Sequence, residues 1–259
     1  VHDFRDVDMH GLRGDFSWYA NDDHILTWGV EARRESARYR YRSEAEYDGF
    51  YLAYPGVPES IEREISVSPS GGRYSAYVSD RWQVTPDLVL DSGLRWDRQT
   101  YLGPANGSQV SPRFNLLYSP SANLDFRLTW GQYHQSQQIH QMQVEDGVER
   151  FFPSQQADHL ILGTRFSFGQ GWTLRAEAFD KKYSNLRPRF ENLLDPVPLI
   201  AEFEPDRIMV SPDSGRSRGV ELTLQYDANE HINGWASYTL SRVTDRIDRI
   251  NQPRNWDQR

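Results

Sequence analysis

The chain has 259 residues, no cysteine and a formal net charge of −8 at pH 7. The lack of cysteine excludes a disulfide framework and thiolate chemistry, and the acidic balance argues against a nucleic-acid partner, because phosphate binding needs a clustered basic surface. The mean hydropathy of −0.76 is that of a polar protein, but membrane barrels with long polar loops have equally low averages.

Alternating apolar and polar residues predict a series of β-hairpins along the chain. In an extended strand this alternation places the apolar side chains on one face and the polar side chains on the other. Phe126, Leu128 and Trp130, for example, alternate with Arg127 and Thr129. In chain order the predicted hairpins cover residues 12–41, 74–101, 110–134, 157–184 and 217–244.

The connections alternate between short turns inside a hairpin and long polar stretches between hairpins. The long stretches cover residues 42–72, 135–156 and 185–216. In bacterial outer-membrane barrels the short turns are periplasmic and the long loops are extracellular. This pattern predicts that both chain ends lie outside the cell. A complete barrel normally starts and ends on the periplasmic side, so we expect a segment of a larger barrel.

The fold class predicted is all-β, an antiparallel up-and-down transmembrane β-barrel of which this chain supplies ten strands. No helix is evident to cover the apolar faces, and no apolar run approaches the about 20 residues of a transmembrane helix. A soluble β-sandwich remains an alternative, because the same alternation fits a sheet with one buried face.

Four segments resemble the barrels of TonB-dependent outer-membrane receptors. The sequence SPRFNLLY at 111–118, followed by the strand 124–131, is similar to the serine-proline-arginine hairpin of that family. The other three segments are 77–97, 157–186 and 215–238, in the same order and spacing as in the family. Each motif alone is weak, but four in sequence are fairly specific, and together they cover about residues 74–245.

The resemblance implies a receptor and transporter, not an enzyme, with no cofactor. Members have about 22 strands around a plug domain, and bind iron-siderophores, cobalamin, sugars or other scarce nutrients at the outer face for energised import. The implied partners are outer-membrane lipid, a plug domain of the same protein, the TonB complex and a small-molecule nutrient, in a Gram-negative outer membrane.

This chain shows neither the plug nor its energy-coupling box. It departs from the family at 132–136, where QYHQS replaces an aromatic-arginine-alanine-proline run, so the ligand class is not carried over.

Two rival functions follow from the same strands: a passive porin-like channel and an outer-membrane hydrolase. Residues 215–219 read GRSRG and match the G-x-S-x-G nucleophile motif. That motif needs a strand before it and a helix after it, whereas this one follows a proline-rich stretch and opens a strand. Three histidines, His134, His140 and His159, have no compact metal-ligand spacing. We therefore predict neither a catalytic nor a metal site.

The outer loops carry the candidate ligand contacts. A mixture of aromatic and charged side chains suits a bulky ligand that bears acidic groups. The candidates are Tyr133, His134, His140, Phe151 and Phe152 in one loop, and Arg187, Arg189 and Glu191 in the next.

Charged residues two positions apart predict ion pairs on the lumen side of the strands, because residues i and i+2 share a face. The predicted pairs are Arg95 with Asp97, Arg127 with Asp125, and Arg175 with Glu177. They would line a polar interior, and could also form a solute path or a surface on which a plug docks.

Overall fold

The computed structural model describes residues 1–49, 52, 57–102, 107–193, 200–227 and 232–254. Within these ranges there are fourteen strands, more than the ten predicted, and two short 3₁₀ turns, η2 (Val144–Asp146) and η3 (Ala201–Phe203). The strands are β1 (His2–Tyr19), β2 (His24–Glu46), β3 (Ser60–Val67), β4 (Ser70–Thr85), β5 (Leu88–Gln99), β6 (Ser108–Ser121), β7 (Leu124–Gln135), β8 (Gln155–Phe168), β9 (Trp172–Ser184), β10 (Arg189–Asn192), β11 (Arg207–Val210), β12 (Ser214–Asp227), β13 (Asn233–Ile247) and β14 (Ile250–Pro253). No helix among the described residues is long and apolar enough to cross a membrane.

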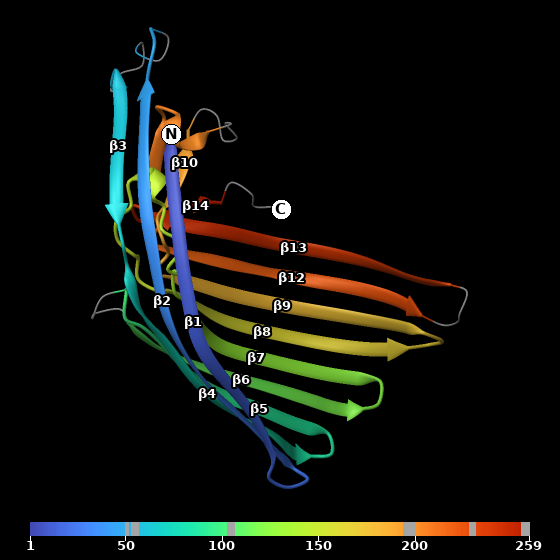
Figure 1. Ribbon diagram of the computed structural model, residues 1–259. Coiled ribbons are helices and arrows are strands. Elements are labelled where there is room, and N and C mark those ends of the chain that lie inside the picture. The colour runs from blue at the N-terminus through green and yellow to red at the C-terminus, as the bar shows by residue number, and fades with distance from the viewer. Residues whose placement is uncertain (50–51, 53–56, 103–106, 194–199, 228–231, 255–259) are drawn as a thin grey trace.

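Twelve of these strands form one antiparallel sheet, in the order β1-β2-β4-β5-β6-β7-β8-β9-β12-β13-β14, with β3 paired to β2. β10 and β11 form a separate two-stranded sheet. The large sheet curves strongly and stays open, with β1 and β14 at opposite ends of the order (Figure 1). The all-β, up-and-down architecture is therefore as predicted, and the sheet is part of a barrel.

The strand pairing aligns the apolar positions into rows across the sheet. One row crosses seven strands through Leu90, Leu116, Leu128, Leu162, Ala178, Val220 and Leu240. No second sheet covers this face in the described structure, and Leu162 and Leu240 are 55% and 53% exposed. Such a large uncovered apolar surface is incompatible with the β-sandwich alternative, which would bury these side chains in a closed core.

Strands β1 and β2 are longer than predicted. β2 runs for 23 residues, roughly 75 Å at the usual rise of a strand, whereas a strand needs only about 9–11 residues to cross a membrane. The predicted loop 42–72 therefore contains the end of β2, all of β3 and the start of β4, and the predicted loop 185–216 contains β10 and β11. Beyond Arg33 the period of two continues in β2, with Ala37, Tyr39 and Tyr41 buried on one face and exposed arginines between them. The strand runs past residue 41, where the predicted hairpin ended, to Glu46.

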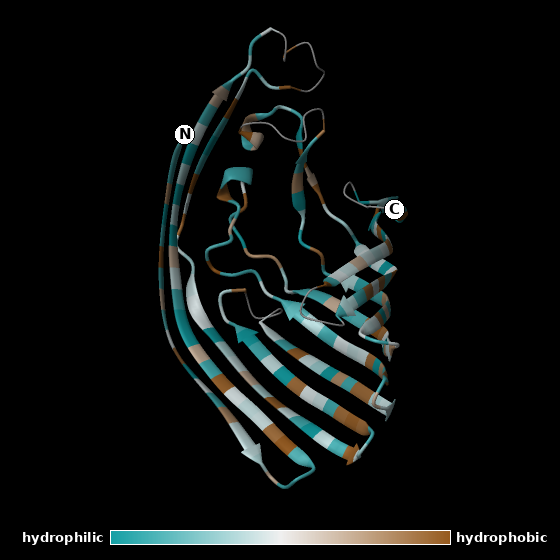
Figure 2. Cartoon of the chain, turned by 90° about the vertical axis from the view of Figure 1, so that its right-hand side faces the viewer, coloured by the Kyte–Doolittle hydropathy of each residue, from teal (hydrophilic) through white to brown (hydrophobic). Residues whose placement is uncertain are grey.

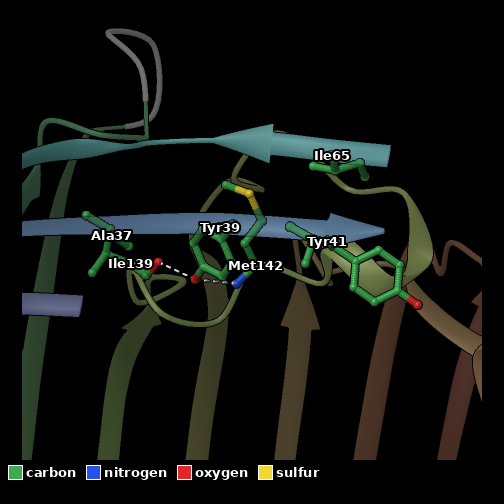
Figure 3. Close-up of a cluster of buried hydrophobic side chains, with 7 residues drawn as sticks. Ala37, Tyr39, Tyr41, Ile65, Ile139 and Met142 are labelled. Atoms are coloured by element: carbon green, nitrogen blue, oxygen red, sulfur yellow. Dashed lines mark hydrogen bonds between the residues drawn. The ribbon is translucent and has the colours of Figure 1, made fainter. Parts of the chain in front are cut away.

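A small buried cluster lies at the end of the sheet from which the long connections emerge, which we call the outer end. It packs against the loop between β7 and β8, which we call the β7–β8 loop (residues 136–154). Tyr39 on β2 is fully buried, and its hydroxyl donates to the carbonyl of Ile139, at 2.7 Å, and accepts from the N–H of Met142, at 3.4 Å (Figure 3). The cluster comprises Ala37, Tyr39, Tyr41, Ile65, Ile139, Met142 and Val144. The core of the described structure thus sits where the loops fold back onto the strands.

The two faces of the sheet can be assigned from this contact. The β7–β8 loop lies on the concave side (Figure 2), so Tyr39 faces that side. Trp28 and Val30 are an odd number of positions from Tyr39 along β2, and therefore face the convex side. Both are exposed. The apolar rows thus form the convex surface, and the charged residues between them line the concave lumen.

Candidate ligand-binding site at the outer ends of the strands

The outer loops are fastened to one another across the concave side of the sheet. The Arg63 guanidinium on β3 donates to the carbonyl of Glu145, at 2.6 Å. The Glu145 carboxylate pairs with Arg5 on β1, at 2.7 Å. Arg207 on β11 pairs with Asp146, whose side chain is 1% exposed. Elements far apart in sequence are therefore joined into one assembly over the lumen (Figure 2).

A pocket of about 330 Å³ opens beside this assembly, between the ends of β8, β10 and β14. It is lined by Gln155, Leu186, Arg187, Arg189, Glu191, Pro212 and Arg254. We call it the arginine pocket. Three guanidinium groups converge here, a composition suited to carboxylate or phosphate groups, which arginine binds through a rigid fork of donors.

The three guanidinium groups differ in how they are neutralised. Arg189 pairs with Glu191 and, at 2.8 Å, with the buried Asp245 on β13. Arg254 makes two hydrogen bonds to the same carboxylate, at 3.1 and 2.9 Å. Arg187 forms no ion pair with any described residue, and its buried Nε has no hydrogen-bond partner. Burial lowers the pKa of the Arg187 guanidinium, which is the electrostatic signature of a cation that lacks a counter-charge.

The other predicted ligand contacts do not gather in this pocket. Tyr133 and His134 lie on β7, not in a loop. The Tyr133 ring lies between the Arg113 guanidinium, at 4.7 Å, and the His159 ring, at 4.6 Å, and His134 Nδ1 lies 3.0 Å from the hydroxyl of Ser111. The predicted set is therefore divided between strand β7 and the loops.

Within the β7–β8 loop the three remaining candidates have different surroundings. Phe151 packs edge-on against Tyr101, with ring centroids 5.1 Å apart, beside the buried cluster. The N–H of Phe152 donates to the side-chain oxygen of Gln137, at 2.9 Å. His140 is exposed. No group of three or more metal-binding side chains comes together among the described residues.

The lumen wall carries one of the predicted ion pairs and rearranges another. Arg95 makes two hydrogen bonds to Asp97, at 2.7 and 2.8 Å. Asp125 instead pairs with Arg165 on β8, which contradicts the predicted Arg127–Asp125 pair. Arg165 is the residue directly opposite Asp125, and directly opposed side chains begin about 5 Å apart, closer than residues two positions apart on one strand.

The third predicted pair, Arg175 with Glu177, forms no ion pair, although both residues are described. Arg127, Arg165, Arg175 and Glu177 instead line a shallow hollow of about 180 Å³ in the lumen wall. This part of the wall presents three guanidinium groups, one of them neutralised by Asp125. The lumen surface is therefore polar and locally basic.

Sequence reasoning missed the residues that hold the outer assembly together. Arg207 and Asp146 are 61 positions apart, and Arg189 and Asp245 are 56 apart. Pairs of this kind carry no local spacing signal. The hint that the sequence does hold is Asp245 itself, an acid between the apolar Val243 and Ile247 in the inward register of its strand.

The comparisons with known proteins decide the family. The family model described as "TonB dependent receptor-like, beta-barrel" matches residues 2–258. The chain belongs to the TonB-dependent receptors. Because the family is one of receptors, this barrel is not an enzyme, which excludes the hydrolase alternative.

Individual relatives resemble this TonB-dependent receptor over most of its sequence. The ferric-pyoverdine BN7/BN8 receptor of Pseudomonas putida is 26% identical over 213 residues, which is 78% of this chain and 25% of that receptor. The siderophore receptor PirA from Pseudomonas aeruginosa is 15% identical, with a TM-score of 0.61 over 93% of this chain and 43% of that one. The outer membrane transporter YddB from Escherichia coli is also 15% identical, with a TM-score of 0.64 over 93% of this chain and 34% of that one. The chain thus spans a quarter to less than half of these relatives, and the two structures show the shared fold.

Proposed function

We propose that this TonB-dependent receptor barrel is part of the wall of a Gram-negative outer-membrane importer that takes up an iron chelate of the siderophore class. The convex apolar rows would face lipid, the polar concave side would enclose a plug domain of the same protein, and import would be energised through TonB. In this proposal the hairpins at 12–41, 74–101, 110–134, 157–184 and 217–244 cross the membrane, and the stretches at 42–72, 135–156 and 185–216 form the outer surface.

The observation that carries this proposal is the arginine pocket. Among the described residues Arg187 has no ion-pair partner, although it is half-buried, and it lies in a pocket at the outer ends of the strands, where a ligand would arrive. Siderophores commonly bear carboxylate, catecholate or hydroxamate oxygens, which are acceptors for a guanidinium. The relative from Pseudomonas putida, which is 26% identical, is a ferric-pyoverdine receptor. This supports the siderophore class of ligand.

The remaining candidate contacts take secondary roles in the proposal. Arg189 and Glu191 would complete the arginine pocket. Tyr133 would meet the ligand below it on the lumen wall, His134 would contribute from the end of β7, and His140, Phe151 and Phe152 would contribute from the β7–β8 loop. The lumen residues Arg95, Asp97, Asp125, Arg127, Arg175 and Glu177 would face the plug, where charges complementary to this wall are expected.

Binding and uptake of a radiolabelled ferric siderophore by cells that express the whole receptor would test the proposal. We expect Arg187→Ala to weaken binding by roughly tenfold or more, as for loss of a charge-assisted hydrogen bond. Arg38→Ala, which removes an exposed arginine on the convex face of β2, is the matched control and should bind normally. Uptake should stop in cells without TonB, whereas a passive porin-like channel would continue to admit its solute.

A further inference from the structure

Five basic side chains gather on the convex face of the sheet, directly outside the apolar surface. They are Lys182 on β9, Arg216 and Arg218 on β12, and Arg242 and Arg246 on β13, and all five are exposed. They line a hollow of about 430 Å³. We call this group the convex basic patch.

The register places the patch on the same face as the apolar rows. Arg218 lies opposite Asp180 on one side and Arg242 on the other. Two positions further along each strand, Val220 lies opposite Ala178 and Leu240. Residues two positions apart in a strand share a face, so one step of roughly 7 Å separates these charges from the apolar surface.

The charge of the patch is incompletely balanced by the protein. Arg216 pairs with Asp180, at 2.7 Å. Within the part of the chain that the structure describes, Lys182, Arg218, Arg242 and Arg246 form no ion pair. Asp158, which lies opposite Lys182, accepts a hydrogen bond from Gln156 at 3.1 Å.

Arg218 on β12 and Arg242 on β13 are direct partners on neighbouring strands. Like charges in directly opposed positions destabilise a sheet. In a chain whose net charge is −8, this concentration of positive charge is costly unless an anion is placed between the two guanidinium groups.

The position of the patch indicates which kind of anion it binds. It lies on the face proposed to contact lipid, and at the end of the strands from which the long connection between β9 and β12 emerges, which is the outer end. A nutrient entering the lumen would be on the opposite, concave side. The phosphate groups available at this depth on the lipid side belong to the phosphorylated glycolipid of the outer leaflet.

We propose that the convex basic patch binds the phosphate groups of an outer-leaflet glycolipid, while the acyl chains of that lipid pack against Val220, Leu240 and their neighbours. This inference rests on the outer-membrane location in the proposed function. The hollow between Arg218 and Arg242 holds one phosphate, and Lys182, Arg216 and Arg246 surround it. The patch thereby anchors the barrel wall at a defined depth in the membrane.

Native mass spectrometry of the whole receptor in detergent tests this assignment, with titrations of a bis-phosphorylated glycolipid, its dephosphorylated form and inorganic phosphate. The wild-type receptor should retain the phosphorylated lipid and bind the other two weakly. The double variant Arg218→Ala/Arg242→Ala should lose affinity for it by at least roughly tenfold. The control double variant Arg38→Ala/Arg40→Ala removes two exposed arginines of the same face further from the apolar rows, and should bind like wild type.

Equal binding of the phosphorylated and dephosphorylated lipids, or unchanged binding by the Arg218/Arg242 variant, would overturn the inference. So would competition by inorganic phosphate at the same concentration as the lipid, because the site would then be one for free phosphate. Ferric-siderophore binding measured in parallel should be the same in all variants. A receptor that holds the glycolipid but binds no siderophore refutes the proposed function alone.

Discussion

Arg207 and Asp146 form an ion pair that joins the small β10–β11 sheet to the β7–β8 loop. The pair is largely buried, because the side chain of Arg207 is 14% exposed and that of Asp146 is 1% exposed. A second hydrogen bond between the two groups measures 2.8 Å. Arg207 also donates to the side-chain oxygen of Asn192, at 2.8 Å. The pair closes the chain of contacts that runs from β1 and β3 through the loop to β11, so it couples the loops that surround the proposed ligand site.

Replacing Arg207 by alanine should release the β7–β8 loop. The buried Asp146 carboxylate would lose its counter-charge, which typically costs about 3 kcal/mol or more. We expect faster hydrogen exchange and faster proteolysis within residues 136–154, with the barrel strands unchanged. Arg150→Ala, at an exposed position in the same loop, should have little effect. Protection of the loop equal to that of the wild type would contradict the proposed coupling.

Removing the Tyr39 hydroxyl should loosen the same loop from its other side. In Tyr39→Phe the Ile139 carbonyl and the Met142 N–H lose their shared partner in a buried environment, which costs about 1–3 kcal/mol. Hydrogen exchange at the Met142 N–H measures the effect directly. Tyr19→Phe, at a position that is 74% exposed, serves as the control and should leave exchange as it is.

Replacing Asp245 by asparagine should change the arginine pocket in two opposing ways. Asp245 is 1% exposed and neutralises both Arg189 and Arg254. Its loss should destabilise the outer assembly by about 3 kcal/mol, while it frees two guanidinium groups for an anionic ligand. We expect tighter but more salt-sensitive siderophore binding together with a lower unfolding temperature. Weaker binding at all salt concentrations would mean that the carboxylate orients the pocket.

The lumen wall offers a test between the predicted and the observed partner of Asp125. Arg165→Ala removes the observed partner and should destabilise the barrel by about 1 kcal/mol, a modest effect because Arg165 is 44% exposed. Arg127→Ala, the partner expected from sequence, should cost less. Urea unfolding in detergent or vesicles separates the two variants, and a larger effect at Arg127 would favour the predicted pair.

A charge on the convex face should prevent correct insertion. Leu162 lies in the apolar row, and Leu162→Arg should cost roughly 2–4 kcal/mol if that row lies near the middle of a bilayer. Thr129→Arg, on the lumen side of the neighbouring strand, should be tolerated. The folded fraction recovered in lipid vesicles measures the difference. Equal recovery of the two variants would mean that the convex face does not contact lipid.

The sequence by itself determined most hairpins of the large sheet, because strands with one apolar and one polar face repeat with a period of two. Phe126, Leu128 and Trp130 show that period clearly, and the four family motifs gave the order of the strands. The arginine pocket was partly predictable, since Arg187, Arg189 and Glu191 are close together in a long polar connection.

Only the tertiary structure decided how the outer half is built. Beyond the apolar rows, β2 exposes arginines on its convex face and buries Tyr39 and Tyr41 on its concave face against a loop about 100 residues further along the chain, while backbone pairing with β1 and β3 continues. The partners of Asp125, Asp146 and Asp245 come from other strands and loops. Such contacts depend on strand register and loop folding, and no spacing along the chain encodes them.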